Sequence, residues 1–324
     1  MNNRVGVIGT GAFGIALSKL AYSNNHDVMA WTKFEAEKKL IDETGMNSQV
    51  LPNVLIPKEI KITTDLSEIV DFCEVIILAI PVSFLENTLI ELGRYELSNK
   101  YFCIASKGIE EKNNLLLHEL FNKYINSNNL ALISGPSFAI DIIEGNTVGL
   151  SIASYNDLTY EKICSCLVNK HFILNRCDDM FGLELCGTIK NVIAIASGIL
   201  GGLEVSDSTK SFFLTKALYE MEEILALLVG KRTTPYTLGG MGDLILTCGS
   251  IKSRNYQFGY LLAQDSDEAK EFLSNNTVEG MHALKSLIAL IDKIGEQNKL
   301  ITLIKKIIID KKDPKLILDY LVQN

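Results

Sequence analysis

A glycine-rich turn near the N-terminus constrains the fold of this chain more than any other feature. The segment RVGVIGTGAFG places Gly9, Gly11 and Gly14 in the pattern G-x-G-x-x-G, after a β-branched run and at the start of a helical pattern. In that context the first glycine permits a tight turn, the second lets a pyrophosphate approach, and the third lets helix and strand pack closely. The helix N-terminus adds N–H donors for phosphates. The segment therefore predicts a dinucleotide site.

The first part of the chain alternates short apolar runs with helical stretches. We expect strands at residues 4–9, 26–31, 74–80, 101–106, 130–134, 147–153 and 171–175. Several of these runs are apolar on both faces, as is typical of strands covered by helices on each side. The pattern predicts an α/β fold with a doubly wound parallel sheet, which makes residues 1–176 a dinucleotide-binding domain.

From residue 177 to residue 324 the strand signals fade and helical patterns take over. We expect helices at residues 180–200, 208–230, 252–263, 279–294, 299–311 and 314–322. The second domain is therefore predicted to be all-α and to carry the substrate and catalytic residues.

Composition excludes several classes of protein. A net charge of −8 argues against general nucleic-acid binding, although local cations can still bind an anionic ligand. The seven cysteines include one C-x-C pair without a partner pair, so we expect reduced thiols and no metal site. The apolar runs are shorter than the roughly 20 residues that span a bilayer, and no signal peptide is visible. These features predict a soluble, cytoplasmic protein without a membrane span.

The end of the second predicted strand bears on the choice of cofactor. NAD-selective folds often place Asp or Glu there to bind the ribose 2′-hydroxyl. Here Trp31 and Thr32 occupy the strand end, Lys33 follows, and Glu35 lies slightly late. Lys33 is either a solvated surface lysine or a cation for a 2′-phosphate. This arrangement favours NADPH over NADH without excluding NADH.

Three further loops follow predicted strands, at the edge where open α/β sheets bind ligands. They place Pro81, Lys107 and the Gly135–Ser137 turn beside the cofactor. Each has a structural alternative, because Pro81 could simply begin a loop and Ser137 could cap a helix. The three loops together favour an anionic substrate.

Lys190 stands out in the helical segment ELCGTIKNVIAIASG. No Asp or Glu lies four residues before or after it in the sequence. Its neighbours on the same helix face are small or apolar: Cys186, Gly187, Ile193, Ala194 and Ser197. One interpretation is a lysine whose stem covers apolar surface while its amine reaches water. The other is a lysine in a cleft that accepts a proton from a hydroxyl as hydride leaves the same carbon.

A second polar cluster lies in LGGMGDLILTCGSIKSRNYQFG. Asp243 and Thr247 are four residues apart, so they share a face if the segment is helical, and they could orient Lys190. Arg254 and Asn255 follow Ser253 at a predicted helix start, where a guanidinium is suited to bind phosphate. The alternative is a helix cap next to a surface arginine.

These segments together resemble a known family. GTGAFGIAL, ASKGIE, SGPSFA, ELCGTIKNVIAIASG, GMGDLILTC and SRNYQFG are similar to segments of the bacterial-type NAD(P)-dependent sn-glycerol-3-phosphate dehydrogenases, in the same order. The resemblance implies a Rossmann-like domain followed by a helical domain. It also implies reversible hydride transfer between NAD(P)H and glycerone phosphate, giving sn-glycerol 3-phosphate for phospholipid synthesis. Separately from the resemblance, a homodimer is a candidate assembly.

The resemblance also implies roles for individual residues. Lys190 is similar to the family's proton acceptor, and four further residues to its catalytic surroundings: Lys107, Asn191, Asp243 and Thr247. The implied substrate contacts are Lys107, Gly135, Ser137, Lys190, Asp243, Ser253, Arg254 and Asn255. The implied cofactor contacts, with those argued above, are Gly9, Gly11, Ala12, Phe13, Gly14, Lys33, Pro81, Lys107, Ala139, Arg254, Thr277 and Glu279.

Two other functions stay open at this point. A related β-hydroxyacid dehydrogenase also combines a dinucleotide-binding domain with a helical domain and a catalytic lysine, although SGPSFA and SRN argue against it. A dinucleotide-sensing regulator could keep the fold without catalysis, but a sensor has no need for a proton acceptor such as Lys190.

Overall fold

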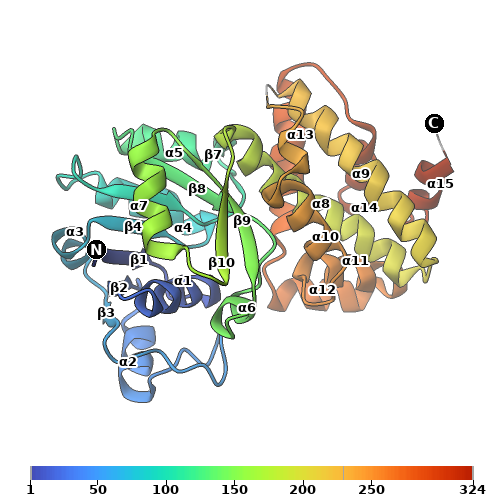
Figure 1. The fold of residues 1–324 in the computed structure, drawn as a ribbon. Helices are drawn as coiled ribbons and strands as arrows, with labels where there is room; N and C mark the ends of the chain where they lie inside the picture. The colour runs from blue at the N-terminus through green and yellow to red at the C-terminus, as the bar shows by residue number, and fades with distance from the viewer. Residues whose placement is uncertain (1, 229, 323–324) are drawn as a thin grey trace. The chain divides into compact units, whose positions relative to one another are not determined.

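The computed structural model describes residues 2–228 and 230–322 and divides into two compact units (Figure 1). The α/β unit comprises Met1–Lys107 and Leu117–Met180, and the helical unit comprises Gly108–Leu116 and Phe181–Asn324. The predicted boundary after residue 176 lies close to this division. The segment Gly108–Leu116, however, packs with the helical unit although its neighbours in sequence belong to the α/β unit.

The α/β unit is built on one eight-stranded sheet with the order β10-β9-β8-β5-β4-β1-β2-β3. Its strands are β1 (Arg4–Ile8), β2 (Asp27–Trp31), β3 (Lys61–Thr63), β4 (Val75–Leu78), β5 (Tyr101–Ile104), β8 (Leu130–Ser134), β9 (Val148–Ser154) and β10 (Phe172–Arg176). Every residue of the central strand β4 is buried, as expected for a strand covered on both faces. The predicted doubly wound α/β fold class is confirmed, and all seven predicted strands are present.

The expectation of a wholly parallel sheet is wrong at one position. β9 runs antiparallel to β8, with Ile133 opposite Ile152, whereas the other neighbouring strands of this sheet are parallel. The connection between β8 and β9 carries only the five-residue helix α6 (Ala139–Ile143). The chain turns back after this short helix and pairs antiparallel.

The described helices of the α/β unit follow the strands along the chain. Besides α6 they are α1 (Ala12–Ser23), α2 (Glu35–Thr44), α3 (Leu66–Phe72), α4 (Val82–Leu92), α5 (Leu117–Tyr124) and α7 (Asp157–Leu167). Apolar side chains from the sheet pack with those of α1 and α7 in one continuous core. This core holds the ends of β1, β2 and β4 in place, and the loops that leave those ends form a pocket.

The helical unit is organised around its first long helix, α8 (Met180–Gly202). The other helices are α9 (Asp207–Leu227), α10 (Asp243–Cys248), α11 (Arg254–Gln264), α12 (Ser266–Asn275), α13 (Glu279–Lys293), α14 (Lys299–Ile308) and α15 (Leu316–Val322). A short antiparallel hairpin, β6 (Ile109–Glu110) and β7 (Leu115–Leu116), joins this unit beside α13, so the unit is not purely α-helical.

Helix α8 is the core of its unit. Within residues 2–228 and 230–322 it is the one helix whose length and hydropathy would allow it to cross a membrane, but the apolar 18-residue window within it is entirely buried inside the protein. A buried core helix can have the same length and hydropathy as a membrane-spanning helix. Small residues let α11 approach closely: a Cβ on Gly198 would lie 2.1 Å from the carbonyl oxygen of Tyr256, and one on Gly259 would lie 2.0 Å from that of Ile195.

A buried carboxylate joins the C-terminal helices to α9. Glu220 of α9 accepts hydrogen bonds from the Asn298 amide (2.7 Å) and the Tyr320 hydroxyl (2.8 Å). The Lys216 amine lies 4.5 Å from the centroid of the Tyr320 ring and donates to the Tyr320 carbonyl at 3.0 Å. Burial, and then the hydrogen bond to Glu220, raises the pKa of the Tyr320 hydroxyl, which keeps it a donor. These contacts anchor α15.

We predict that Tyr320→Phe destabilises the helical unit. The substitution leaves the buried Glu220 carboxylate one donor short, which costs about 1–3 kcal/mol of unfolding free energy. Urea unfolding followed by circular dichroism measures the change. Tyr219→Phe on the exposed side of α9 is the control and should stay within about 0.5 kcal/mol. Equal stability of the two variants would show that the Glu220 contacts do not anchor α15.

Candidate functional site

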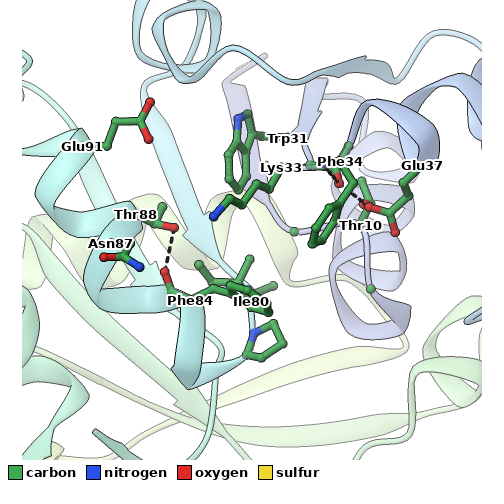
Figure 2. A pocket seen from close by; sticks show the side chains of 15 residues that line it. Thr10, Trp31, Lys33, Phe34, Glu37, Ile80, Phe84, Asn87, Thr88 and Glu91 are labelled. Carbon is green, nitrogen blue, oxygen red and sulfur yellow. Dashed lines mark hydrogen bonds between the residues drawn. The ribbon is translucent and has the colours of Figure 1, made fainter. Parts of the chain in front are cut away.

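A pocket in the α/β unit lies where β1, β2 and β4 end (Figure 2). The residues that line it come from the glycine-rich turn, from the segment between the end of β2 and the first turn of α2, and from the segment that runs from the end of β4 through α4: Gly9, Thr10, Gly11, Trp31, Thr32, Lys33, Phe34, Glu37, Ala79, Ile80, Pro81, Phe84, Asn87, Thr88 and Glu91. Open α/β sheets bind ligands at such an edge. Of the residues expected there, Gly9, Gly11, Lys33 and Pro81 line the pocket.

The three glycines of the turn differ in their surroundings. Gly9 has φ 120°, and a Cβ there would lie 2.4 Å from the carbonyl oxygen of Ala79, so the turn requires glycine. A Cβ on Gly14 would lie 2.0 Å from the Gly9 carbonyl oxygen, because α1 packs closely on the turn. Around Gly11, by contrast, no described residue other than its two chain neighbours has an atom within 4 Å of the Cβ position. The turn is therefore tightly packed on the protein side and open at Gly11 towards a ligand.

The structure fits a bound dinucleotide. Helix α1 begins at Ala12, directly after the open glycine, so Ala12 and Phe13 present their backbone N–H groups at its N-terminus. Phe34 and Phe84 make an edge-to-face pair with ring centroids 6.3 Å apart, and their exposed fractions are 54% and 40%. Such exposed aromatic rings offer an apolar wall to a planar base.

The charged side chains Lys33 and Glu37 of this pocket contact different residues. The Lys33 amine lies 5.8 Å from the centroid of the Phe84 ring. The Glu37 carboxylate, which the sequence interpretation missed, accepts hydrogen bonds from the Thr10 and Thr32 hydroxyls and from the Asn47 amide. Its signal was present in the sequence: it lies 23 residues after Gly14, in the first turn of α2.

A second group of predicted residues lies on the loops after β5 and β8. The Lys107 amine donates to the Gly135 carbonyl oxygen at 3.2 Å. Gly135 is buried, and a Cβ there would lie 2.7 Å from the Cα of Leu150, so packing against β9 explains this glycine. Ala139 begins α6.

Among the residues that the structure describes, the Ser137 hydroxyl has no hydrogen-bond partner. Its oxygen is buried, and Phe138, not Ser137, is the residue that precedes α6. The alternative of a capping serine is therefore wrong. A buried hydroxyl without a partner is costly in a folded protein, and a ligand can supply the missing partner.

Lys190 lies inside the helical unit and not at its surface. Its exposed fraction is 6%, its amine lies 2.9 Å from Asp243 Oδ1, and it donates to the Thr247 hydroxyl at 2.8 Å. The Thr247 hydroxyl donates to Asp243 Oδ1 at 3.3 Å. The alternative of a lysine that reaches water is therefore wrong. An ammonium group has three donors. Among the described residues, α10 accepts two of them, and the third remains for a ligand.

Asn191, the next residue of α8, begins a second network. Its amide donates to Glu279 Oε2 and its carbonyl oxygen accepts from the Asn255 amide, both at 3.0 Å. Asn255 Oδ1 accepts from the Gly280 backbone N–H at 2.8 Å. The network ties α8 to the first turns of α11 and α13, and it brings together three of the predicted site residues.

The start of α11 combines a helix cap with a free cation. Ser253 caps the helix by accepting from the Tyr256 backbone N–H at 3.3 Å, so its capping role is structural. Arg254 is exposed and makes no ion pair with any described residue. Thr277 is exposed just before α13. The structure thus leaves the Arg254 guanidinium available to an anionic ligand.

The cysteines take no visible part in this chemistry. None of the seven forms a disulfide with another described cysteine, and burial raises the pKa of the Cys248 thiol close to Lys190 and Asp243. In the parts of the chain that the structure describes, no group of three His, Cys, Asp or Glu side chains could hold a metal ion.

Comparison with known proteins connects these sites to one family. The model of the NAD-dependent glycerol-3-phosphate dehydrogenase N-terminus matches residues 4–159, and that of its C-terminus matches residues 179–319. A glycerol-3-phosphate dehydrogenase [NAD(P)+] of Fusobacterium nucleatum is 32% identical over 314 residues, covering 96% of this chain and 93% of that protein. One from Pseudomonas fluorescens is 33% identical over 296 residues, covering 90% of this chain and 82% of that protein.

Solved structures agree with these matches. The crystal structure of glycerol-3-phosphate dehydrogenase from Coxiella burnetii superposes with a TM-score of 0.92 at 27% identity and covers 100% of this chain and 99% of that one. A D-mandelate dehydrogenase solved with NADH shares the fold alone, with a TM-score of 0.63 and 13% identity over 99% of this chain and all of that one. By both halves of its sequence and by its fold, this chain belongs to the NAD-dependent glycerol-3-phosphate dehydrogenase family.

Proposed function

We propose that this chain interconverts glycerone phosphate and sn-glycerol 3-phosphate as an NAD(P)-dependent glycerol-3-phosphate dehydrogenase. The observation that carries the proposal is the buried lysine of α8, held by Asp243 and Thr247, in a chain whose two halves both match that family. The β-hydroxyacid dehydrogenase alternative has the weaker support, because both halves of the chain match the glycerol-3-phosphate dehydrogenase models. A buried proton-transfer group also disfavours a sensor without catalysis.

We assign the two parts of the chemistry to the two domains predicted from the sequence. Residues 1–176 bind the cofactor, with the pyrophosphate at Gly9, Gly11, Ala12, Phe13 and Gly14. Residues 177–324 supply the proton-transfer group. The bound nicotinamide supplies or accepts hydride. Further cofactor contacts are assigned to Lys33, Pro81, Lys107, Ala139, Arg254, Thr277 and Glu279.

Lys190 transfers the proton that accompanies the hydride. In the reducing direction its ammonium donates a hydrogen bond to the carbonyl oxygen of the substrate and then gives up the proton as that oxygen becomes a hydroxyl. In the oxidising direction the neutral amine takes the proton back. Asp243 and Thr247 orient the amine through the contacts described above, and Asn191 fixes the neighbouring turn of α8.

The substrate phosphate requires cations and neutral donors. Arg254 is exposed at the start of α11, and the guanidinium group is suited to bidentate contact with a phosphate. Asn255, Lys107 and Ser137 add donors, and the unpartnered Ser137 hydroxyl gains the partner that it lacks in the protein alone.

We also propose a setting for the enzyme. It acts in the cytoplasm, its product feeds phospholipid synthesis, and it forms a homodimer. Support for self-association comes from large side chains left exposed in the helical unit: Phe212 and Tyr219 lie on one face of α9, and Tyr236 hydrogen-bonds to Glu222 of the same helix. Sedimentation velocity tests the dimer, and a monomer at micromolar concentration would contradict it.

The decisive measurement is oxidation of NADH and NADPH in the presence of glycerone phosphate. We expect turnover with at least one cofactor. Lys190→Ala should lower kcat by roughly 10² or more, the usual effect of losing a general acid–base group, and leave the cofactor dissociation constant near the wild-type value. Lys285→Ala, on the exposed side of α13, is the control and should behave as wild type. Substantial turnover by Lys190→Ala would contradict the assigned mechanism.

Arg254→Ala tests the phosphate contact. Loss of a charge-assisted contact of about 1.5–3 kcal/mol should lower kcat/KM for glycerone phosphate by roughly one to two factors of ten. Dihydroxyacetone, which lacks the phosphate, should be a very poor substrate already and lose little more. The four values form a double cycle that isolates the coupling between Arg254 and the phosphate.

Two controls make this cycle interpretable. The cofactor dissociation constant is measured separately, because Arg254 is also assigned a cofactor contact. Lys252→Ala removes an exposed positive charge two residues away and should leave the coupling intact. If both substrates lose equally after the cofactor correction, Arg254 does not bind the phosphate.

A further inference from the structure

We propose that Glu37 selects the cofactor: its carboxylate accepts a hydrogen bond from the adenosine ribose 2′-hydroxyl and repels a 2′-phosphate, so that NADH binds more tightly than NADPH. The inference rests on the proposed function, since it concerns the nucleotide of that reaction. It reverses the preference for NADPH expected from Lys33.

The position of Glu37 is the first argument. Folds of this class hold the ribose between the glycine-rich turn after β1 and the end of β2, where an acidic residue usually ends the strand. Here β2 ends at Trp31, and Thr32 follows. Glu37 reaches this place from α2, because its carboxylate accepts from Thr10 of the turn (2.7 Å) and from Thr32 beyond the strand. It therefore occupies the place of the missing strand-end carboxylate.

The hydrogen bonds of Glu37 are the second argument. Thr10, Thr32 and Asn47 are all buried, and the Asn47 amide also donates to the Thr10 carbonyl oxygen at 2.9 Å, which fixes the group on the turn. All three donors to Glu37 are neutral, so no cation among the described residues forms an ion pair with its negative charge. A carboxylate accepts about four hydrogen bonds, which leaves room for a ribose hydroxyl.

The direction of Lys33 is the third argument. Figure 2 shows the Lys33 side chain extending towards Thr88, away from Glu37, with Phe34 between the two charged groups. Its amine is placed over the Phe84 ring, as given above. Among the described residues that line this pocket, the charged ones are Lys33, Glu37 and Glu91, so the lining carries a net negative charge. Such a lining disfavours the two additional charges of a 2′-phosphate.

The test compares two probes that differ only by the 2′-phosphate. Dissociation constants of adenosine 5′-monophosphate and adenosine 2′,5′-bisphosphate are measured by calorimetry on the full chain, and those of NADH and NADPH by fluorescence. We expect the wild type to prefer NADH by about tenfold or more. Glu37→Gln keeps the length of the side chain and removes the charge, and it should tighten the bisphosphate and NADPH by roughly tenfold while weakening NADH slightly.

Two further variants show whether the cofactor preference depends on Glu37 itself or on another charge near the pocket. Glu35→Gln removes a carboxylate from the same turn of α2, one that accepts from Thr64 and does not line the pocket, and should leave all four constants unchanged. Lys33→Ala should affect NADH and NADPH alike. A selective loss of NADPH in Lys33→Ala, with an unchanged preference in Glu37→Gln, would overturn the proposal.

A measurement on the wild type alone guards against a variant that folds poorly. Electrostatic repulsion between partly exposed charges weakens with ionic strength, so the preference for NADH should narrow between low and high salt. A preference for NADPH at low salt would contradict the role of Glu37. These constants are obtained without substrate. Failure of glycerone phosphate turnover would therefore refute the proposed function and leave the test of Glu37 intact.

Discussion

The helical unit depends on a positive charge buried inside its most apolar helix. Removing an ammonium from water is costly unless a counter-charge and hydrogen bonds replace the water. Asp243 and Thr247 provide these for Lys190, so α10 has to lie against α8 with one face towards the lysine. Because the described contacts with Asp243 and Thr247 use two of its three donors, the ammonium keeps one donor for a ligand.

The packing around α8 follows from the same requirement. The neighbouring Asn191 shares its amide and carbonyl groups with Glu279 and Asn255, which aligns the starts of α13 and α11. Close approach of α11 needs positions without side chains, and Gly198 and Gly259 supply them on the two helices. The small and apolar residues of α8 thus allow the close helix packing that positions Lys190 and Asn191. The same pattern makes the helix resemble a membrane span by composition although it is a core helix.

In the α/β unit the corresponding constraint is the turn after β1. Gly9 and Gly14 are held by backbone atoms so close that no side chain fits, whereas Gly11 faces open space. That difference turns a tightly packed strand–helix junction into a surface that a pyrophosphate can approach. The hydrogen bonds between Thr10 and Glu37 and between Asn47 and Thr10 extend the junction to α2, and they link the phosphate end of the pocket to its ribose end.

The sequence by itself determined the elements whose signals are local. Strand runs apolar on both faces, the glycine spacing before α1, and the four-residue spacing of Asp243 and Thr247 were all readable, because periodicity and turn geometry act over a few residues. Three features depended on contacts between distant segments and were decided by the tertiary structure alone. β9 pairs antiparallel to β8, and residues 108–116 pack with helices far along the chain. Glu37 reaches the end of β2 from helix α2 and accepts hydrogen bonds from the Thr32 hydroxyl and the Asn47 amide. These donors are buried and need a partner within the protein. The carboxylate therefore comes from a position five residues beyond Thr32 and not from the last residue of the strand, where the sequence pattern places it.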